Sequence, residues 1–330
     1  MIKVLLVLIF ITSSYSCQYQ KKAEMKENKT NPLMCDPETG ACEMPISETD
    51  SVKIKIAPDK KPVKIIYYTD PICSSCWGIE PQLRKLKLEY GNYFDIDYRM
   101  GGLLPDWNYN SGGISKPSDV AHHWDEASLY YEMPIDGDVW LEDPLDSSYP
   151  SCIAMKAAQL QDKEKAVHFM RLLREKLYLE KKNIAKWDNI AEAAEKCQLD
   201  IKKLKLDYDN QAQQFFKDDL LYAKSLGIRG FPTLLFTDGS DKLLTVYGSK
   251  PYQFYENTLL ELYPEAKKDS YKNTKDPIFL FDIYPTLTPK EYAVILDKTI
   301  TEAKSILEQL ASEGKLEKKV VKTGVLYLKK

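Results

Sequence analysis

The sequence lacks three features: the strong positive charge of many nucleic-acid-binding proteins, an apolar run long enough to span a membrane, and the ligand spacing of a zinc site. Its 46 Lys and Arg nearly balance 49 Asp and Glu, so the net charge of −3 gives no global sign of nucleic-acid binding. Its apolar run at residues 4–11 is too short to span a bilayer. With three His in all and no second Cys-x-x-Cys beside the one at residues 73–76, it also lacks the ligand spacing of a zinc site. The 330 residues suffice for one large domain or two smaller ones.

The N-terminus carries the pattern of an export signal. A short basic start precedes the apolar run, and small residues lead from it to Cys17. This order predicts a secretory signal peptide over residues 1–16. The position of Cys17 resembles a bacterial lipoprotein box, so we expect cleavage before Cys17, lipidation of its thiol and a membrane-anchored lipoprotein of the cell envelope or periplasm. The alternative is an ordinary signal peptide in which Cys17 is incidental.

Residues 17–61 are rich in Lys, Glu and Pro, which predicts a flexible tether. Within it, Cys35 and Cys42 flank Asp-Pro and Thr-Gly turn signals, so we expect a tight loop that a disulfide could close. Two interpretations stay open for this pair. It is a small structural clip, or it is a second redox pair that exchanges with the Cys-x-x-Cys.

The motif richest in chemistry is Cys73-Ser74-Ser75-Cys76, which follows an apolar strand pattern and opens a helical one. This is the layout of a thioredoxin-type redox site. A helix N-terminus offers free N–H groups and partial positive charge, so we expect Cys73 to be a nucleophile with a lowered pKa. Cys76, one turn deeper, would resolve the mixed disulfide. The two Ser side chains bring no charge, which leaves the direction of electron flow open.

The surrounding pattern predicts an α/β domain over residues 62–268 with a large helical insert at residues 116–226. Apolar runs and turn signals mark its other elements. We expect strands at 63–69 and 94–100, a helix at 73–91, a hairpin at 233–247 and a closing helix at 251–266. A right-handed crossover would make the first two strands parallel.

The tail, residues 275–330, differs from the rest and predicts a small α+β module. Two helices, at 289–296 and 300–313, precede a hairpin at 316–328, and this order resembles a winged helix. From residue 288 onward nine Lys face six Asp or Glu, a net of +3 that is mild for DNA binding. We therefore expect a structural or protein-contact module and no nucleic-acid partner.

Several motifs in a fixed order resemble the DsbA family of thioredoxin-like proteins with a helical insertion, in the branch of FrnE-like and YjbH-like proteins. The resemblance covers residues 63–265, and the tail is similar to that of some YjbH-like relatives. The motifs are Cys73-Ser74-Ser75-Cys76-Trp77, His122-His123-Trp124, residues 139–144, residues 147–152 and residues 227–233.

The resemblance implies a cis peptide bond at Phe231–Pro232, since X-Pro is the common cis linkage. Such a proline beside the thiols would leave the Phe231 backbone free to pair with an extended substrate, and Trp77 would shape the surface around Cys73. A trans proline at a strand start is the alternative. The family needs no small-molecule cofactor; its partners are protein thiols or disulfides and a recycling redox protein.

Two further pairs of residues have open roles. Cys152 and Cys197 lie in the helical insert and are expected to be small buried hydrophobes, or else a disulfide. His122 and His123 are expected to be packing or surface residues, with tuning of Cys73 as the alternative. Asp70 and Glu80 lie close to the thiols in sequence, without an assigned role.

These patterns lead to one main functional hypothesis and two rivals. The main one is a cell-envelope thiol-disulfide oxidoreductase that acts on protein cysteines through a mixed disulfide. The first rival is a non-catalytic adaptor that holds a client protein on the thioredoxin-like body, as YjbH-like relatives do. The second is a glutathione-using isomerase of the same fold, although those sites generally have Ser where this chain has Cys73.

Overall fold

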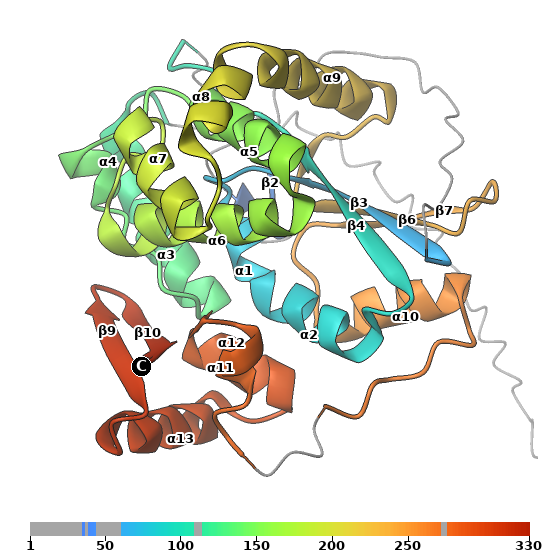
Figure 1. The fold of residues 1–330 in the computed structure, drawn as a ribbon, viewed down its shortest axis with the longest axis vertical. Coiled ribbons are helices and arrows are strands. Elements are labelled where there is room, and N and C mark those ends of the chain that lie inside the picture. Colours follow the sequence, from blue (N-terminus) through green and yellow to red (C-terminus); the bar gives the residue numbers. More distant parts are fainter. Residues whose placement is uncertain (1–34, 37–38, 44–60, 109–113, 272–275) are drawn as a thin grey trace, which may run out of the picture.

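A four-stranded sheet forms the centre of the molecule (Figure 1). The computed structural model describes residues 35–36, 39–43, 61–108, 114–271 and 276–330. The sheet has the order β4-β3-β6-β7. Its strands are β3 (Val63–Thr69), β4 (Phe94–Met100), β6 (Thr233–Thr237) and β7 (Leu243–Tyr247). The β3–β4 pair is parallel and the β6–β7 pair is an antiparallel hairpin, so both predictions are confirmed.

The helix expected at residues 73–91 is two helices, α1 (Ser74–Gly78) and α2 (Glu80–Tyr90). They break at Ile79, which has φ −95° and ψ −1°. Pro81 follows in the first turn of α2, where its missing N–H leaves no helical hydrogen bond unmade. The break separates a short helix carrying the thiols from a longer one that packs under the sheet with α10 (Tyr252–Leu262).

The long middle segment consists of helices joined by loops, as its periodicity predicts. It covers the end of the sheet at which α1 begins (Figure 1). Its helices are α3 (Pro117–Tyr131), α4 (Val139–Glu142), α5 (Tyr149–Gln161), α6 (Lys163–Glu180), α7 (Trp187–Lys196), α8 (Ile201–Asp209) and α9 (Gln211–Ser225). None of the helices in the described ranges is long and apolar enough to cross a membrane.

The tail folds as a winged-helix-like module with its own small core. A short sheet of order β8-β10-β9 packs beside its helices. The elements are α11 (Leu280–Ile283), β8 (Thr286–Leu287), α12 (Pro289–Leu296), α13 (Ile300–Ser312), β9 (Leu316–Val321) and β10 (Gly324–Lys329). Thr288 and Thr299 close capping boxes with Glu291 and Glu302, which explains where α12 and α13 begin.

Part of the expected tether is folded onto the body. Strands β1 (Cys35–Asp36) and β2 (Ala41–Glu43) form a hairpin, and β2 pairs with β5 (Gly230–Phe231) in a second sheet of order β1-β2-β5. The tight loop expected between Cys35 and Cys42 is confirmed as a hairpin, whereas a flexible tether does not describe residues 39–43. They are ordered because their backbone groups find partners at the edge presented by β5.

Candidate functional site

The two cysteines of the Cys-x-x-Cys motif lie at the start of helix α1, just after the turn that follows strand β3. Cys73 and Cys76 form a disulfide. Cys73 is the N-cap of α1, and its Sγ accepts a hydrogen bond from the Cys76 backbone N–H at 3.1 Å. This is the position predicted from the sequence, and the N–H would favour a thiolate once the disulfide is reduced.

Neither sulfur reaches the surface, because Cys73 and Cys76 are both 0 % exposed. Trp77 is buried as well, so the prediction that it shapes the surface around Cys73 is wrong. Its indole Nε1 donates to the Pro134 carbonyl at 3.0 Å, and its ring stacks on Tyr178 with centroids 5.5 Å apart. Trp77 points into the helical insert because that is where its N–H finds a buried acceptor.

The Phe231–Pro232 peptide bond is cis, as the resemblance implies. The Phe231 ring is fully buried against Gly101, where an added Cβ would lie 1.8 Å from a ring carbon. The backbone of Phe231 is not free for a substrate in this structure, because it lies opposite Cys42 in the β2–β5 ladder. The chain's own hairpin thus occupies the strand position expected for a partner.

That ladder brings a third sulfur into the site. Cys42 Sγ lies 3.8 Å from Cys73 Sγ and 3.5 Å from Ser75 Oγ. Ser75 Oγ in turn hydrogen-bonds the Tyr131 hydroxyl at 2.7 Å. This contact joins residues 31 positions apart in the chain, and it agrees with the interpretation from sequence in which the Cys35/Cys42 pair exchanges with the Cys-x-x-Cys. Cys17 and the predicted signal peptide lie outside the described residues.

Asp70 organises the loops behind the thiols. Its carboxylate accepts hydrogen bonds from the N–H groups of Ile72 and Leu103, from Ser148 Oγ and from the Cys152 thiol. Burial raises its pKa in spite of these donors. The hydrogen bonds tie β3, the loop after β4 and the start of α5 together, which is a positioning role that the sequence did not assign.

The remaining cysteines and histidines fall where their first interpretations placed them. Cys152 and Cys197 are buried thiols and do not form a disulfide with each other. Burial raises the pKa of Cys152, and it raises that of Cys197 to about 11. His122 and His123 lie at the surface beside Glu126, at 3.2 and 3.4 Å. Within the described ranges, no group of three or more His, Cys, Asp or Glu is arranged to hold a metal ion.

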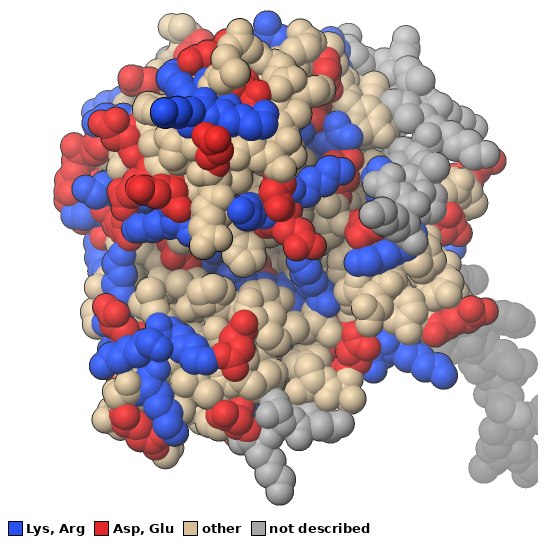
Figure 2. Space-filling model, viewed as in Figure 1, with Lys and Arg blue, Asp and Glu red and all other residues tan. Residues whose placement is uncertain are grey.

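A cavity of about 580 Å³ lies between the body and the C-terminal module, and neither Cys73 nor Cys76 lines it. It is bounded by α2, β4, α6, the end of α7 and residues 284–286. Figure 2 shows basic side chains in the hollow between the two parts. The Arg, Lys and His residues of its wall are Arg84, Lys87, Lys165, His168, Arg171 and Lys196.

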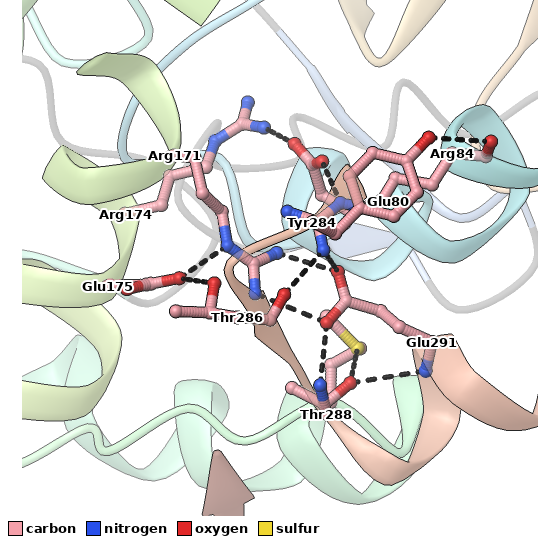
Figure 3. A network of polar contacts seen from close by, with 10 residues as sticks. Glu80, Arg84, Arg171, Arg174, Glu175, Tyr284, Thr286, Thr288 and Glu291 are labelled. Carbon is pink, nitrogen blue, oxygen red and sulfur yellow. Dashed lines mark hydrogen bonds and ion pairs between the residues drawn. The ribbon is translucent and has the colours of Figure 1, made fainter. Parts of the chain in front are cut away.

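One wall of this cavity is a buried ionic network that joins the module to the body (Figure 3). Glu291 of α12 lies 2.7 Å from Arg171 of α6 and 3.1 Å from Arg84 of α2. Arg171 also pairs with Glu175 at 2.6 Å. Burial alone would raise the pKa of Glu291, but the two guanidinium groups outweigh it, and the pKa is lowered. Each of these charged residues lies on a helix, and from the sequence alone its side chain would be expected to face solvent.

Glu80, which sequence proximity left as a candidate near the thiols, belongs to this network instead. Its carboxylate pairs with Arg174, and Arg174 Nη2 donates to Thr69 Oγ1 at 2.7 Å. Thr69 is the last residue of β3, so the network reaches the strand that leads to the Cys-x-x-Cys. Glu80 therefore supports the scaffold of the site and makes no contact with either sulfur among the described hydrogen bonds.

Comparison with known proteins agrees with this architecture. The Thioredoxin family model matches residues 67–257. The ClpXP adapter protein SpxH of Halalkalibacterium halodurans is 35 % identical over 308 residues, covering 90 % of this chain and 96 % of that protein. SpxH of Bacillus subtilis is 32 % identical over 274 residues, covering 81 % and 89 %.

Among solved structures, the cytosolic disulfide reductase DsbM of Pseudomonas aeruginosa superposes with a TM-score of 0.50 at 21 % identity. The superposition covers 60 % of this chain and 99 % of DsbM, and it supports the DsbA-like fold of the body. The match to SpxH is longer than the predicted thioredoxin-like domain, so it cannot be confined to that domain. The chain belongs to the thioredoxin-fold family that includes the ClpXP adapter proteins named SpxH.

Proposed function

We propose that this protein is a client-binding adaptor built on a thioredoxin-like body, the hypothesis that stood second in the sequence analysis. The observation that carries it is the similarity to ClpXP adapter proteins over 90 % of the chain. The buried state of both active-site sulfurs supports it, because a client's disulfide cannot reach Cys73 while the hairpin covers it. A buried Cys73–Cys76 pair is better suited to a protein that binds a client than to an enzyme that repeatedly exchanges disulfides with one.

The cavity between body and module is the place we assign to the client. It is large enough for side chains of a partner's protruding segment. The network of Arg171, Arg84 and Glu291 keeps its two sides in a fixed relation, which lowers the entropy cost of binding. The proposed adaptor therefore recognises a client with both parts of the chain at once.

Site-specific crosslinking tests this placement. A photo-reactive benzoylphenylalanine at His168, which lines the cavity, should capture a client in the native cell. The same group at Leu221, which is 64 % exposed on α9, is the matched control and should not. The captured protein would then be purified, and its binding to this chain measured for the wild type and for the Cys73→Ser/Cys76→Ser variant.

The expected result is binding of the client that persists in the Cys73→Ser/Cys76→Ser variant. Equal capture at both positions would overturn the assigned surface. Loss of client binding in the double variant, with the fold intact by circular dichroism, would overturn the non-catalytic adaptor.

The second candidate is the thiol-disulfide oxidoreductase, favoured by Cys73 at the N-cap of α1 with the Phe231–Pro232 segment on the same site. Its partners would be protein thiols or disulfides and a recycling protein. A glutathione titration of the Cys73–Cys76 pair separates its directions, with about −120 mV marking an oxidant and about −270 mV a reductase. Turnover of a disulfide-containing peptide that the double variant lacks would establish this activity in place of the adaptor.

We also propose export and lipidation at Cys17, on the strength of the basic start, the apolar run and the small residues before it. The compartment decides which clients the protein can meet. Metabolic labelling with a fatty-acid analogue should mark the wild type and leave the Cys17→Ser variant unlabelled. A labelled variant, or an unlabelled wild type retained at full precursor mass, would contradict this.

A further inference from the structure

We propose that Cys35 and Cys42 are a second redox pair that exchanges disulfides with Cys73–Cys76 inside the same chain, through a Cys42–Cys73 mixed disulfide. The hairpin that carries them would act as a built-in substrate. This inference concerns the isolated chain and does not depend on whether the protein acts as an adaptor or as an oxidoreductase.

The first support is the way the hairpin is held. Strand β2 lies antiparallel to β5, with Cys42 opposite Phe231. At the turn, the Ser249 N–H donates to the Gly40 carbonyl at 2.9 Å. Gly248 lies so close to the Thr39 carbonyl oxygen that a Cβ would be 1.9 Å from it. Two separate contacts thus place the hairpin on the body, one at β5, before β6 in the chain, and one at residues 248–249, after β7.

The second support is the distance between the sulfur atoms. Cys42 Sγ and Cys73 Sγ are 3.8 Å apart, and both side chains are at most 1 % exposed. Reacting atoms in a near-attack arrangement are about 3–3.5 Å apart, so a shift of a few tenths of an ångström suffices. Ser75 Oγ, 3.5 Å from Cys42 Sγ, offers a hydroxyl beside the sulfur, and Tyr131 holds that hydroxyl in place.

The third support is the register of the hairpin itself, which pairs Cys35 with Cys42 across β1 and β2. Residues directly opposite in an antiparallel pair have Cα atoms about 4.5–5.5 Å apart. Disulfides bridge Cα atoms about 4.4–6.8 Å apart. The backbone spacing therefore admits a Cys35–Cys42 bond, so the pair can receive the disulfide that Cys73 gives up.

The exchange balances within the chain. When the hairpin pair is reduced, a Cys42 thiolate attacks Cys73, which forms the Cys42–Cys73 bond, breaks Cys73–Cys76 and releases Cys76 as a thiolate. A Cys35 thiolate then attacks Cys42, which forms Cys35–Cys42 and releases Cys73. Two electrons move from the hairpin pair to the α1 pair, and the two protons lost by one are gained by the other. The same steps in reverse return them.

The consequence is a site whose first partner is always present. The hairpin stands at high effective concentration compared with any client in solution. A client would reach Cys73 only after the hairpin separates from β5. The hairpin would then leave with Cys35 and Cys42 in the oxidation state that the exchange gave them. Exchange with the hairpin therefore couples the oxidation of the chain to the accessibility of Cys73.

Trapping of the mixed disulfide tests this proposal. In the full chain, Cys35→Ser/Cys76→Ser removes both resolving thiols, so glutathione disulfide should leave a stable Cys42–Cys73 bond. Peptide mapping by mass spectrometry without reductant should find this linkage in most monomeric chains. The control Cys42→Ser/Cys76→Ser should instead carry glutathione on Cys73 in at least tenfold higher yield. Circular dichroism of both variants checks that they fold.

A second measurement on the wild type keeps the proposal falsifiable if a variant fails to fold. Chains reduced to a single disulfide should contain Cys35–Cys42 in some molecules and Cys73–Cys76 in others. A single disulfide confined to Cys73–Cys76 at every ratio of reduced to oxidised glutathione would overturn the exchange. So would glutathione on Cys73 at equal levels in the two double variants.

Discussion

Two parts of this molecule bring distant segments together, and they do so by opposite means. The N-terminal hairpin meets the redox site through a two-residue ladder and a sulfur contact between Cys42 and Cys73. The C-terminal module meets the body through charges buried around Glu291 and through the hydrogen bond from Arg84 to the Thr286 carbonyl at 2.8 Å.

The difference lies in what separation would leave behind. Removing the hairpin exposes backbone groups that water can satisfy, and it uncovers sulfurs whose bonds can be exchanged. Removing the module would leave Arg171 and Arg84 without the buried carboxylate that they share. The contact of the hairpin is thus suited to opening, and the contact of the C-terminal module is suited to holding the two parts together permanently. A client-binding protein with a covered redox site requires both.

The largest effect should come from breaking the permanent contact. Glu291→Gln removes the charge shared by Arg171 and Arg84 and should lower the free energy of unfolding by about 3–5 kcal/mol. Urea unfolding measures it. Glu302→Gln is the matched control, because Glu302 holds the same capping-box position in α13 at an exposed site without Arg partners. It should cause a small fraction of the loss; equal losses would contradict the account.

The same carboxylate predicts a pH dependence of stability. The folded-state pKa of Glu291 is lowered, so its contribution is complete above the unfolded value of about 4.3 and is lost as pH falls through the lower folded value. Unfolding curves recorded from pH 6 downward should therefore converge for wild type and Glu291→Gln. Parallel curves at every pH would assign the loss to packing instead of charge.

A smaller effect should come from loosening the exchangeable contact. Gly248→Ala drives a Cβ onto the Thr39 carbonyl at a residue with φ +73°, whereas Gly227→Ala carries the same kind of backbone strain, at φ +64°, with no atom nearby. Both should lose about 1–2 kcal/mol of global stability. Only Gly248→Ala should speed hydrogen exchange at β2 and β5, by about tenfold or more. Equal exchange in both variants would mean that Gly248 does not hold the hairpin.

The smallest effect tests whether exposed charges also fix the module. Lys322 in the β9–β10 turn lies 2.7 Å from both Asp125 and Asp138 of the insert, but its side chain is 40 % exposed. Exposed pairs contribute about 0–1 kcal/mol, so Lys322→Ala should barely shift the urea midpoint. Lys318→Ala, which breaks a pair with Glu308 inside the module, should do the same. If Lys322→Ala lost nearly as much stability as Glu291→Gln, the exposed ion pairs would hold the module on the body as strongly as the buried network.

The sequence by itself determined what depends on neighbours along the chain. The strand at residues 63–69 is a mainly apolar run, and the thiols follow it at a helix start, so their positions were predictable. Thr288 and Thr299 marked the module's helices because a capping box is a four-residue pattern. The winged-helix-like order followed from those boundaries.

Only the tertiary structure decided which of those pieces meet. Cys42 and Cys73 are 31 residues apart, and Arg171 and Glu291 are 120 apart, so no local periodicity records either contact. Trp77 turned inward for a similar reason, since its acceptor at Pro134 is 57 residues away. Burial of charge and sulfur is set by what packs over a residue after folding. The sequence therefore predicted the redox cysteines and the helix boundaries. The burial of Cys73 under the hairpin and the ionic network around Glu291 were decided by packing.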